Sequence, residues 1–116
     1  MILTDFSQMR VYLKLGITDM RKSINTLSIL VQEEMKLDVF SPGLFVFCNR
    51  RCEIIKILYW DNNGFALWQK RLEKHKFKWP KDEKDIFEID HNQLGWLLSG
   101  LDITAAHEKL KFSLVS

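Results

Sequence analysis

The middle of the chain carries three apolar runs separated by two turn signals, and this pattern restricts the possible folds more than any other feature. The first run is Leu44–Cys48, and the short loop Asn49–Arg51 separates it from the second run, Glu53–Trp60. Asp61–Gly64 then favours a hairpin, because Asn and Gly tolerate positive φ angles. Phe65–Leu72 returns as the third run. The pattern predicts an antiparallel β-meander.

Other short segments predict further strands. The second run is apolar on both of its faces except for Lys56. This pattern is typical of a strand that is covered on both faces and is therefore central in its sheet. Arg10–Leu15 alternates in polarity and predicts a strand before the meander. Lys76–Trp79 predicts a fourth meander strand stopped by Pro80, and Ile86–Ile89 a possible fifth.

A helix is expected before the meander. Thr18 is suited to its N-cap, and Asp19 falls in the first turn, where the helix dipole favours an acid. Apolar residues recur at helical spacing until about Lys36, at Met20, Ile24, Leu27, Leu30, Val31 and Met35. This spacing predicts an amphipathic helix with one buried face.

A second helix is expected after the strands. Asp90 and Gln93 resemble a capping box, and Gly100 suits the helix end. The expected buried stripe consists of Leu94, Leu97, Leu98 and Leu101. A last helix is expected over Thr104–Phe112. Together these elements predict an α+β fold, an antiparallel meander of four to five strands packed with an N-terminal and a C-terminal helix.

Length and composition favour a single globular domain. The chain has 116 residues, of which 47% are hydrophobic and 28% charged, and this length can bury one real core. No apolar run reaches the ~18 residues of a membrane span. The start MILTDFSQMR has Asp5 where a signal peptide needs a basic region. We therefore expect a complete cytoplasmic protein with no membrane partner; its oligomeric state stays open.

The two cysteines do not predict a metal site. Cys48 and Cys52 supply only two thiols, and the three histidines do not complete a known ligand spacing with them. We expect reduced thiols beside a turn; a cross-strand disulfide is the alternative, which a cytosolic location disfavours. No P-loop, dinucleotide fingerprint or nucleophile motif is present, so we expect a protein without cofactor or catalytic residues.

Positive charge is concentrated in the middle of the chain. Residues 50–81 hold nine basic and three acidic residues, a net of +6, while the remainder holds eight basic and twelve acidic residues, a net of −4. Such an uneven field can steer an anionic partner. The alternative is a solvated sheet face whose lysines protect an edge.

Two groups of cations are candidate phosphate contacts. Arg21 and Lys22 would lie at the start of the first helix, where free backbone N–H groups bind anions, unless they only reach into water. Lys74, Lys76 and Lys78 would share one face of an extended strand, at a spacing near that of successive phosphates. Neither group includes a base-reading helix, so any DNA binding should be largely non-specific.

Six aromatic residues allow two interpretations. They are Tyr59, Trp60, Phe65, Trp68, Phe77 and Trp79. They could stack on unpaired bases, as in single-strand binding proteins. Core packing under the helices is the favoured interpretation, and Trp60 and Trp68 in particular are predicted to be core residues.

Three blocks of sequence resemble a known family. They are Gly16–Lys22, then Leu44–Phe47 with Asn49–Arg51, then Lys56–Asp61 continuing through Gly64–Glu73 to Phe77–Pro80. Together they resemble the TnpB-type, second-ORF accessory protein of insertion-sequence elements of the "sixty-six" family. The resemblance covers residues 9–102, and the tail or helix of residues 103–116 lies beyond it.

The resemblance implies a role in DNA transposition as a non-catalytic partner of a larger transposase that carries the acidic active site. DNA, that transposase and other proteins of the same element are the implied partners. Whether DNA or protein contacts the basic surface stays open. A metal-dependent enzyme is a third alternative. The expected contacts are Arg21, Lys22, Arg50, Arg51, Lys56, Lys70 and Arg71, with Lys74, Lys76 and Lys78 as supporting phosphate contacts.

Overall fold

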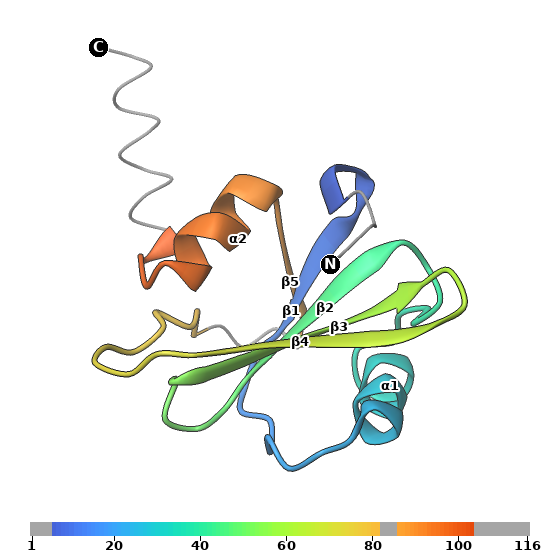
Figure 1. Ribbon diagram of the computed structural model, residues 1–116, viewed down its shortest axis with the longest axis horizontal. Helices are drawn as coiled ribbons and strands as arrows, with labels where there is room; N and C mark the ends of the chain where they lie inside the picture. Colours follow the sequence, from blue (N-terminus) through green and yellow to red (C-terminus); the bar gives the residue numbers. More distant parts are fainter. Residues whose placement is uncertain (1–5, 82–85, 104–116) are drawn as a thin grey trace.

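A computed structural model describes residues 6–81 and 86–103 and contains one mixed five-stranded sheet with two α-helices. Along the chain the elements are the short 3-10 helix η1 (Phe6–Gln8), β1 (Arg10–Lys14), α1 (Ile24–Glu33), β2 (Gly43–Cys48), β3 (Ile54–Asp61), β4 (Gly64–Arg71), β5 (Ile86–Ile89) and α2 (His91–Leu98). The strands are ordered β4-β3-β2-β1-β5 (Figure 1). The α+β class is thus confirmed.

The predicted antiparallel meander holds only for part of the sheet. β2, β3 and β4 form it, with a two-residue hairpin in which Asp61 pairs with Gly64 and Asn62 has a φ of 58°. The expectation of a purely antiparallel sheet is wrong, because β1 lies parallel to β2, with Arg10 opposite Gly43. α1 returns the chain to the starting end of β1, and a strand that follows such a crossover runs parallel to the first.

The segment after β4 also departs from expectation. The predicted strand Lys76–Trp79 is wrong: residues 73–81 are irregular, and β5 pairs antiparallel with β1 at the far edge of the sheet. The chain must therefore cross from one edge of a five-stranded sheet to the other, about 19 Å at ~4.8 Å per strand spacing. A crossing chain cannot pair with β4 along its length, so it forms no strand there.

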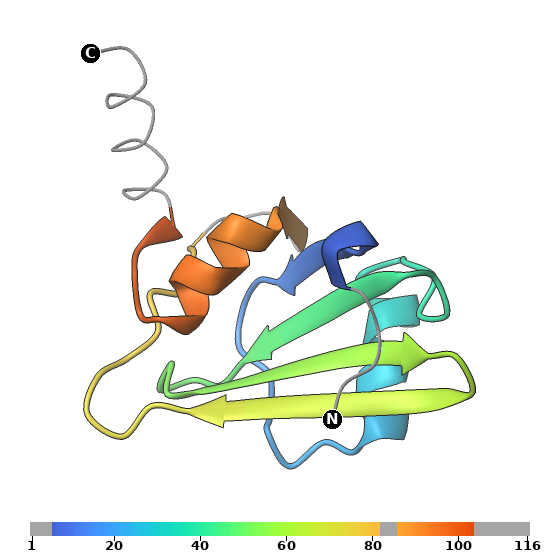
Figure 2. The same ribbon diagram turned by 45° about the horizontal axis from the view of Figure 1, so that its top comes forward.

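The two helices cover opposite faces of the sheet (Figures 1 and 2). On one face α1 packs Leu27 and Val31 against Phe45, Phe47 and Leu58. On the other face α2 packs Leu94 and Leu97 in a cluster with Val11, Leu13, Val46, Ile55, Ile57 and Tyr59. β3 is apolar at successive positions because both of its faces are covered, as predicted for an interior strand.

The first helix begins later than its sequence pattern suggests. Its N-cap is Ser23, whose Oγ accepts a hydrogen bond from the Thr26 amide, and the predicted cap at Thr18 is wrong. Thr18 is buried instead, and its amide donates to the carbonyl of Cys48 at 2.9 Å. The helix ends at Glu33, short of the predicted Lys36.

The second helix begins as predicted. The side chain of Asp90 accepts from the Gln93 amide at 2.8 Å, while Gln93 Oε1 accepts from the Asp90 amide at 3.0 Å, which completes a capping box. Gly100 follows the helix with a φ of 85°, a conformation that suits glycine. The predicted helix Thr104–Phe112 lies outside the described residues.

Candidate nucleic-acid interface

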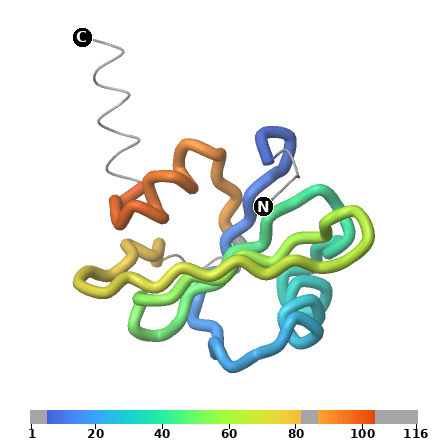
Figure 3. Tube along the Cα trace, in the orientation of Figure 1, coloured from blue at the N-terminus to red at the C-terminus, as the bar shows by residue number. Residues whose placement is uncertain are grey.

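The topology brings the basic segments to one end of the sheet. β2 ends, β3 begins and β4 ends there, since Cys48 pairs with Ile55 and Ile54 with Arg71. The irregular residues 73–81 after β4, here called the crossing segment, lie beside the β2–β3 turn in both views of the ribbon and in the tube of Figure 3. Backbone hydrogen bonds from Leu72 to Glu53 and from Phe77 to Cys52 hold the two segments together.

Arg50 and Arg51 occupy a rigid turn between β2 and β3. The side chain of Asn49 accepts hydrogen bonds from the amides of Glu53 at 2.9 Å and Ile54 at 3.0 Å. The Cys52 amide donates to the Asn49 carbonyl, and Cys52 itself has a φ of 57°. Because these bonds fix the backbone, both exposed arginines are presented at little conformational cost.

Arg21 does not lie at a helix N-terminus. It precedes α1, and its guanidinium makes three hydrogen bonds of 2.8–3.1 Å to both carboxylate oxygens of Asp19. The hydrogen bonds from Arg21 lower the pKa of Asp19 to about 2. Lys22 also precedes the helix and is half-buried. The predicted placement of Arg21 and Lys22 in the first turn of α1 is therefore wrong. Arg21 instead lines an open depression together with Arg50 and Arg51.

Two of the predicted contact lysines donate hydrogen bonds to main-chain carbonyls within the fold. Lys56 is buried on the α1 face of β3, and its Nζ donates to the carbonyl of Met20 at 2.6 Å. Lys70 Nζ donates to the carbonyl of Leu98 at 2.8 Å, at the end of α2. Both acceptors lie far away along the chain, so no local pattern could have assigned these lysines.

The remaining predicted cations are exposed. Arg71 pairs with Glu73 at 3.1 Å, which offsets its charge. Lys74, Lys76 and Lys78 are exposed on the crossing segment, and so is His75. Phe77, between these lysines, is buried, and Trp79 is half-buried. Among the described residues, none of these three lysines forms an ion pair, and neither does Arg50 or Arg51. We call these five side chains the basic end of the sheet.

The aromatic residues divide between core and surface. Tyr59 and Phe77 are buried, whereas Trp60, Phe65, Trp68 and Trp79 are half-buried. Trp68 packs against the α2-side core, but Trp60 instead contacts the rings of Phe40 and Phe65 at centroid distances of 5.1 and 5.0 Å. The prediction that Trp60 is a core residue is therefore wrong.

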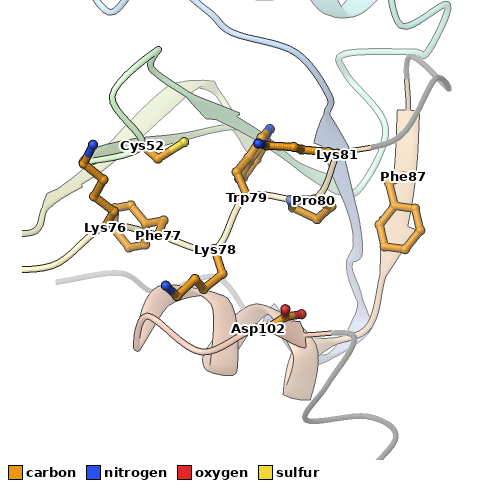
Figure 4. Close-up of a pocket in the computed structure, with 9 residues that line it drawn as sticks. All are labelled: Cys52, Lys76, Phe77, Lys78, Trp79, Pro80, Lys81, Phe87 and Asp102. Carbon is orange, nitrogen blue, oxygen red and sulfur yellow. The ribbon is translucent and has the colours of Figure 1, made fainter.

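One group of residues was not anticipated from the sequence. Lys81, Phe87 and Asp102 line a pocket with Cys52 and the crossing segment 76–81 (Figure 4). These residues come from four separate parts of the chain, so only the fold brings them together. Over the described residues, no group of three or more His, Cys, Asp or Glu side chains is placed to hold a metal ion.

Comparison with known proteins assigns the chain to a family. Residues 9–108 match the family model described as IS66 Orf2-like protein. The chain belongs to the IS66 Orf2-like family. Membership in this family implies an accessory role in the transposition of an insertion sequence, as the sequence blocks suggested.

Two relatives come from Sinorhizobium fredii (strain NBRC 101917 / NGR234). The uncharacterized protein y4hO is 40% identical over 93 residues, covering 80% of this chain and 81% of the relative. The uncharacterized protein y4jC is 32% identical over 91 residues, covering 78% of each. No solved structure matches the chain. In the part of the chain that the structure describes, no helix has the length and apolar character needed to cross a membrane.

Proposed function

We propose that this protein is a non-catalytic transposition factor that binds DNA through the basic end of the sheet, with little sequence preference. The observation that carries the proposal is the convergence of five exposed cations from two segments, Arg50, Arg51, Lys74, Lys76 and Lys78, unpaired among the described residues. Unpaired guanidinium and ammonium groups bind phosphate favourably, because their contact with the DNA releases counterions.

The lack of sequence preference follows from where the cations lie. They project from a turn and from an irregular segment, whereas reading of bases in the major groove uses a helix or a β-ribbon that enters the groove. Contacts of this type fix position along the phosphate backbone and carry no direct sequence information.

The test compares charge removal at the two ends of the sheet. Arg50→Gln with Arg51→Gln removes two charges from the basic end. Arg10→Gln with Lys36→Asn removes two from exposed residues at the other end, and Asn suits the φ of 58° at Lys36. Binding of a labelled duplex is followed by anisotropy over a salt series.

We expect the basic-end variant to lower the slope of log affinity against log salt by about 0.9 for each lost phosphate contact. The control variant should keep the wild-type slope. Equal losses in the two variants would indicate an effect of net charge alone, and absence of binding at about 50 mM salt, where phosphate attraction is strong, would exclude the proposal.

A second candidate function is docking on the transposase, and one observation favours it. Phe40 is 53% exposed and lies against the half-buried Trp60 and Phe65 beside the β3–β4 hairpin. Clustered aromatic side chains at a surface are typical anchors of protein interfaces. Retention of the element's transposase by wild-type protein, with loss in Phe40→Ser, would support this function; equal retention by both would exclude this surface.

A further inference from the structure

The pocket beside the basic end combines positive charge with aromatic surface. Its volume is about 530 Å³, within the ~300–1,000 Å³ typical of ligand sites. Figure 4 shows the crossing segment 76–81 running between Cys52 on one side and Asp102 on the other, with Phe87 of β5 nearby. Lys76, Lys78 and Lys81 contribute ammonium groups to its lining.

The aromatic part of the lining is held firmly. Phe77 is 2% exposed, and its amide donates to the Cys52 carbonyl at 2.7 Å, which fixes the middle of the segment against the β2–β3 turn. Trp79 and Phe87 are half-buried and belong to the margin of the α2-side core. Packing against the core therefore holds both rings at the pocket.

Trp79 contributes a ring rather than a hydrogen-bond donor. Its Nε1 is buried and has no hydrogen-bond partner among the described residues. An unsatisfied buried donor lowers stability. No hydrogen bond among the described residues therefore accounts for a tryptophan at this position, and what its indole supplies to the pocket is aromatic surface. The pocket thus offers a π-surface flanked by lysines.

This combination matches one class of ligand. Proteins that bind single-stranded DNA stack its bases on aromatic side chains and hold its phosphates with cations. The carboxylate of Asp102, also in the lining, accepts hydrogen bonds only, and its negative charge repels phosphate. A duplex conceals its base faces and could use the lysines alone.

We infer that this pocket binds one unpaired nucleotide of single-stranded DNA, with its base against Trp79 and Phe87 and its phosphate at the lysines. The inference rests on the proposed DNA-binding function and adds to it a preference for unpaired over paired DNA at the basic end.

A thiol in the pocket supplies a direct reporter. Cys52 lines the pocket and is half-buried, whereas Cys48 is fully buried, and burial raises the pKa of the Cys48 thiol. Alkylation requires an accessible thiolate, so N-ethylmaleimide should modify Cys52 first. Bound single-stranded DNA should slow this reaction, and mass spectrometry of the digested protein measures it at each cysteine.

The experiment measures Cys52 alkylation and DNA affinity in parallel. The probes are a labelled single strand of about 12 nucleotides, within the site sizes of single-strand binders, and a hairpin duplex containing the same sequence. Trp79→Leu removes the ring, while Trp79→Phe keeps an aromatic face and removes the unsatisfied donor. Circular dichroism establishes that both variants are folded.

We expect the single strand to bind more tightly than the duplex and to protect Cys52. Trp79→Leu should lose about tenfold in single-strand affinity with duplex affinity unchanged, and Trp79→Phe should resemble wild type. If Trp79→Leu does not fold, protection of Cys52 in the wild-type protein still decides the question.

The failures of the two proposals are distinguishable. DNA that binds with equal affinity as single strand and duplex, and leaves Cys52 alkylation unchanged, would overturn this inference and leave DNA binding by the basic end standing. Absence of binding to either probe at low salt would overturn both.

Discussion

Lys70 on β4 donates a hydrogen bond from Nζ to the main-chain carbonyl of Leu98 at 2.8 Å, and so ties the edge strand to the last turn of α2. The terminal carbonyls of a helix have no partner within the helix and carry partial negative charge. Lys70 satisfies one of them with a cation, so we expect its charge to stabilise the fold rather than to contact DNA.

Replacement of Lys70 by Met should therefore lower stability. We expect a loss of about 1–2 kcal/mol in the free energy of unfolding, from a hydrogen bond to a charged group at a helix C-terminus. Urea denaturation measures this loss. DNA affinity and its salt dependence should not change, and a normal stability with weakened DNA binding would return Lys70 to the interface.

The exposed arginine pair should behave in the opposite way. Arg50→Ala with Arg51→Ala removes side chains that form no ion pair among the described residues, so the melting temperature should change little. Transposition of the complete element in cells should fall. Full transposition activity in this variant would remove the turn from the functional surface, and a large loss of stability would indicate a structural role.

The two tryptophans of the hairpin should differ in importance. Trp68 packs against the core under α2, and Trp68→Ala should cost about 3 kcal/mol. Trp60 contacts only the rings of Phe40 and Phe65 among the aromatic pairs of the described residues, so Trp60→Ala should cost about 1–2 kcal/mol. Chemical denaturation of both variants tests the order, and equal losses would contradict the division between core and surface.

The ion pair between Asp19 and Arg21 predicts a response to acid. Arg21 lowers the pKa of Asp19 to about 2 in the folded protein, against about 3.9 in an unfolded chain. Because the folded value is depressed, the pair stabilises the fold above about pH 4, and this contribution is lost as the pH falls toward 2.

A carboxyl-carbon NMR titration measures the Asp19 pKa directly. Arg21→Gln should return it toward the ordinary value, and added salt should raise it in the wild-type protein because the pair is exposed. A wild-type pKa near 4 would mean that the pair does not persist in solution.

Local patterns in the sequence determined most of the elements. The hairpin at Asn62, the capping box of Asp90 and Gln93, and the interior position of β3, which is apolar except for Lys56 and Asp61, each have a signal in neighbouring residues, and each was predicted correctly. The rigid turn at Arg50 and Arg51 was also predicted, because its two flanking strands adjoin it in the chain. The family could likewise be identified from blocks of adjacent residues.

Contacts between distant segments were decided only by the tertiary structure. The parallel pairing of β1 with β2 and the position of β5 at the far edge depend on hydrogen bonds that leave no local signal. The same holds for Lys56 and Lys70, whose acceptors lie 36 and 28 residues away. The sequence does not show whether a lysine ammonium donates to a main-chain carbonyl or to water. Only the fold could therefore separate the lysines that bond within the protein from the exposed ones.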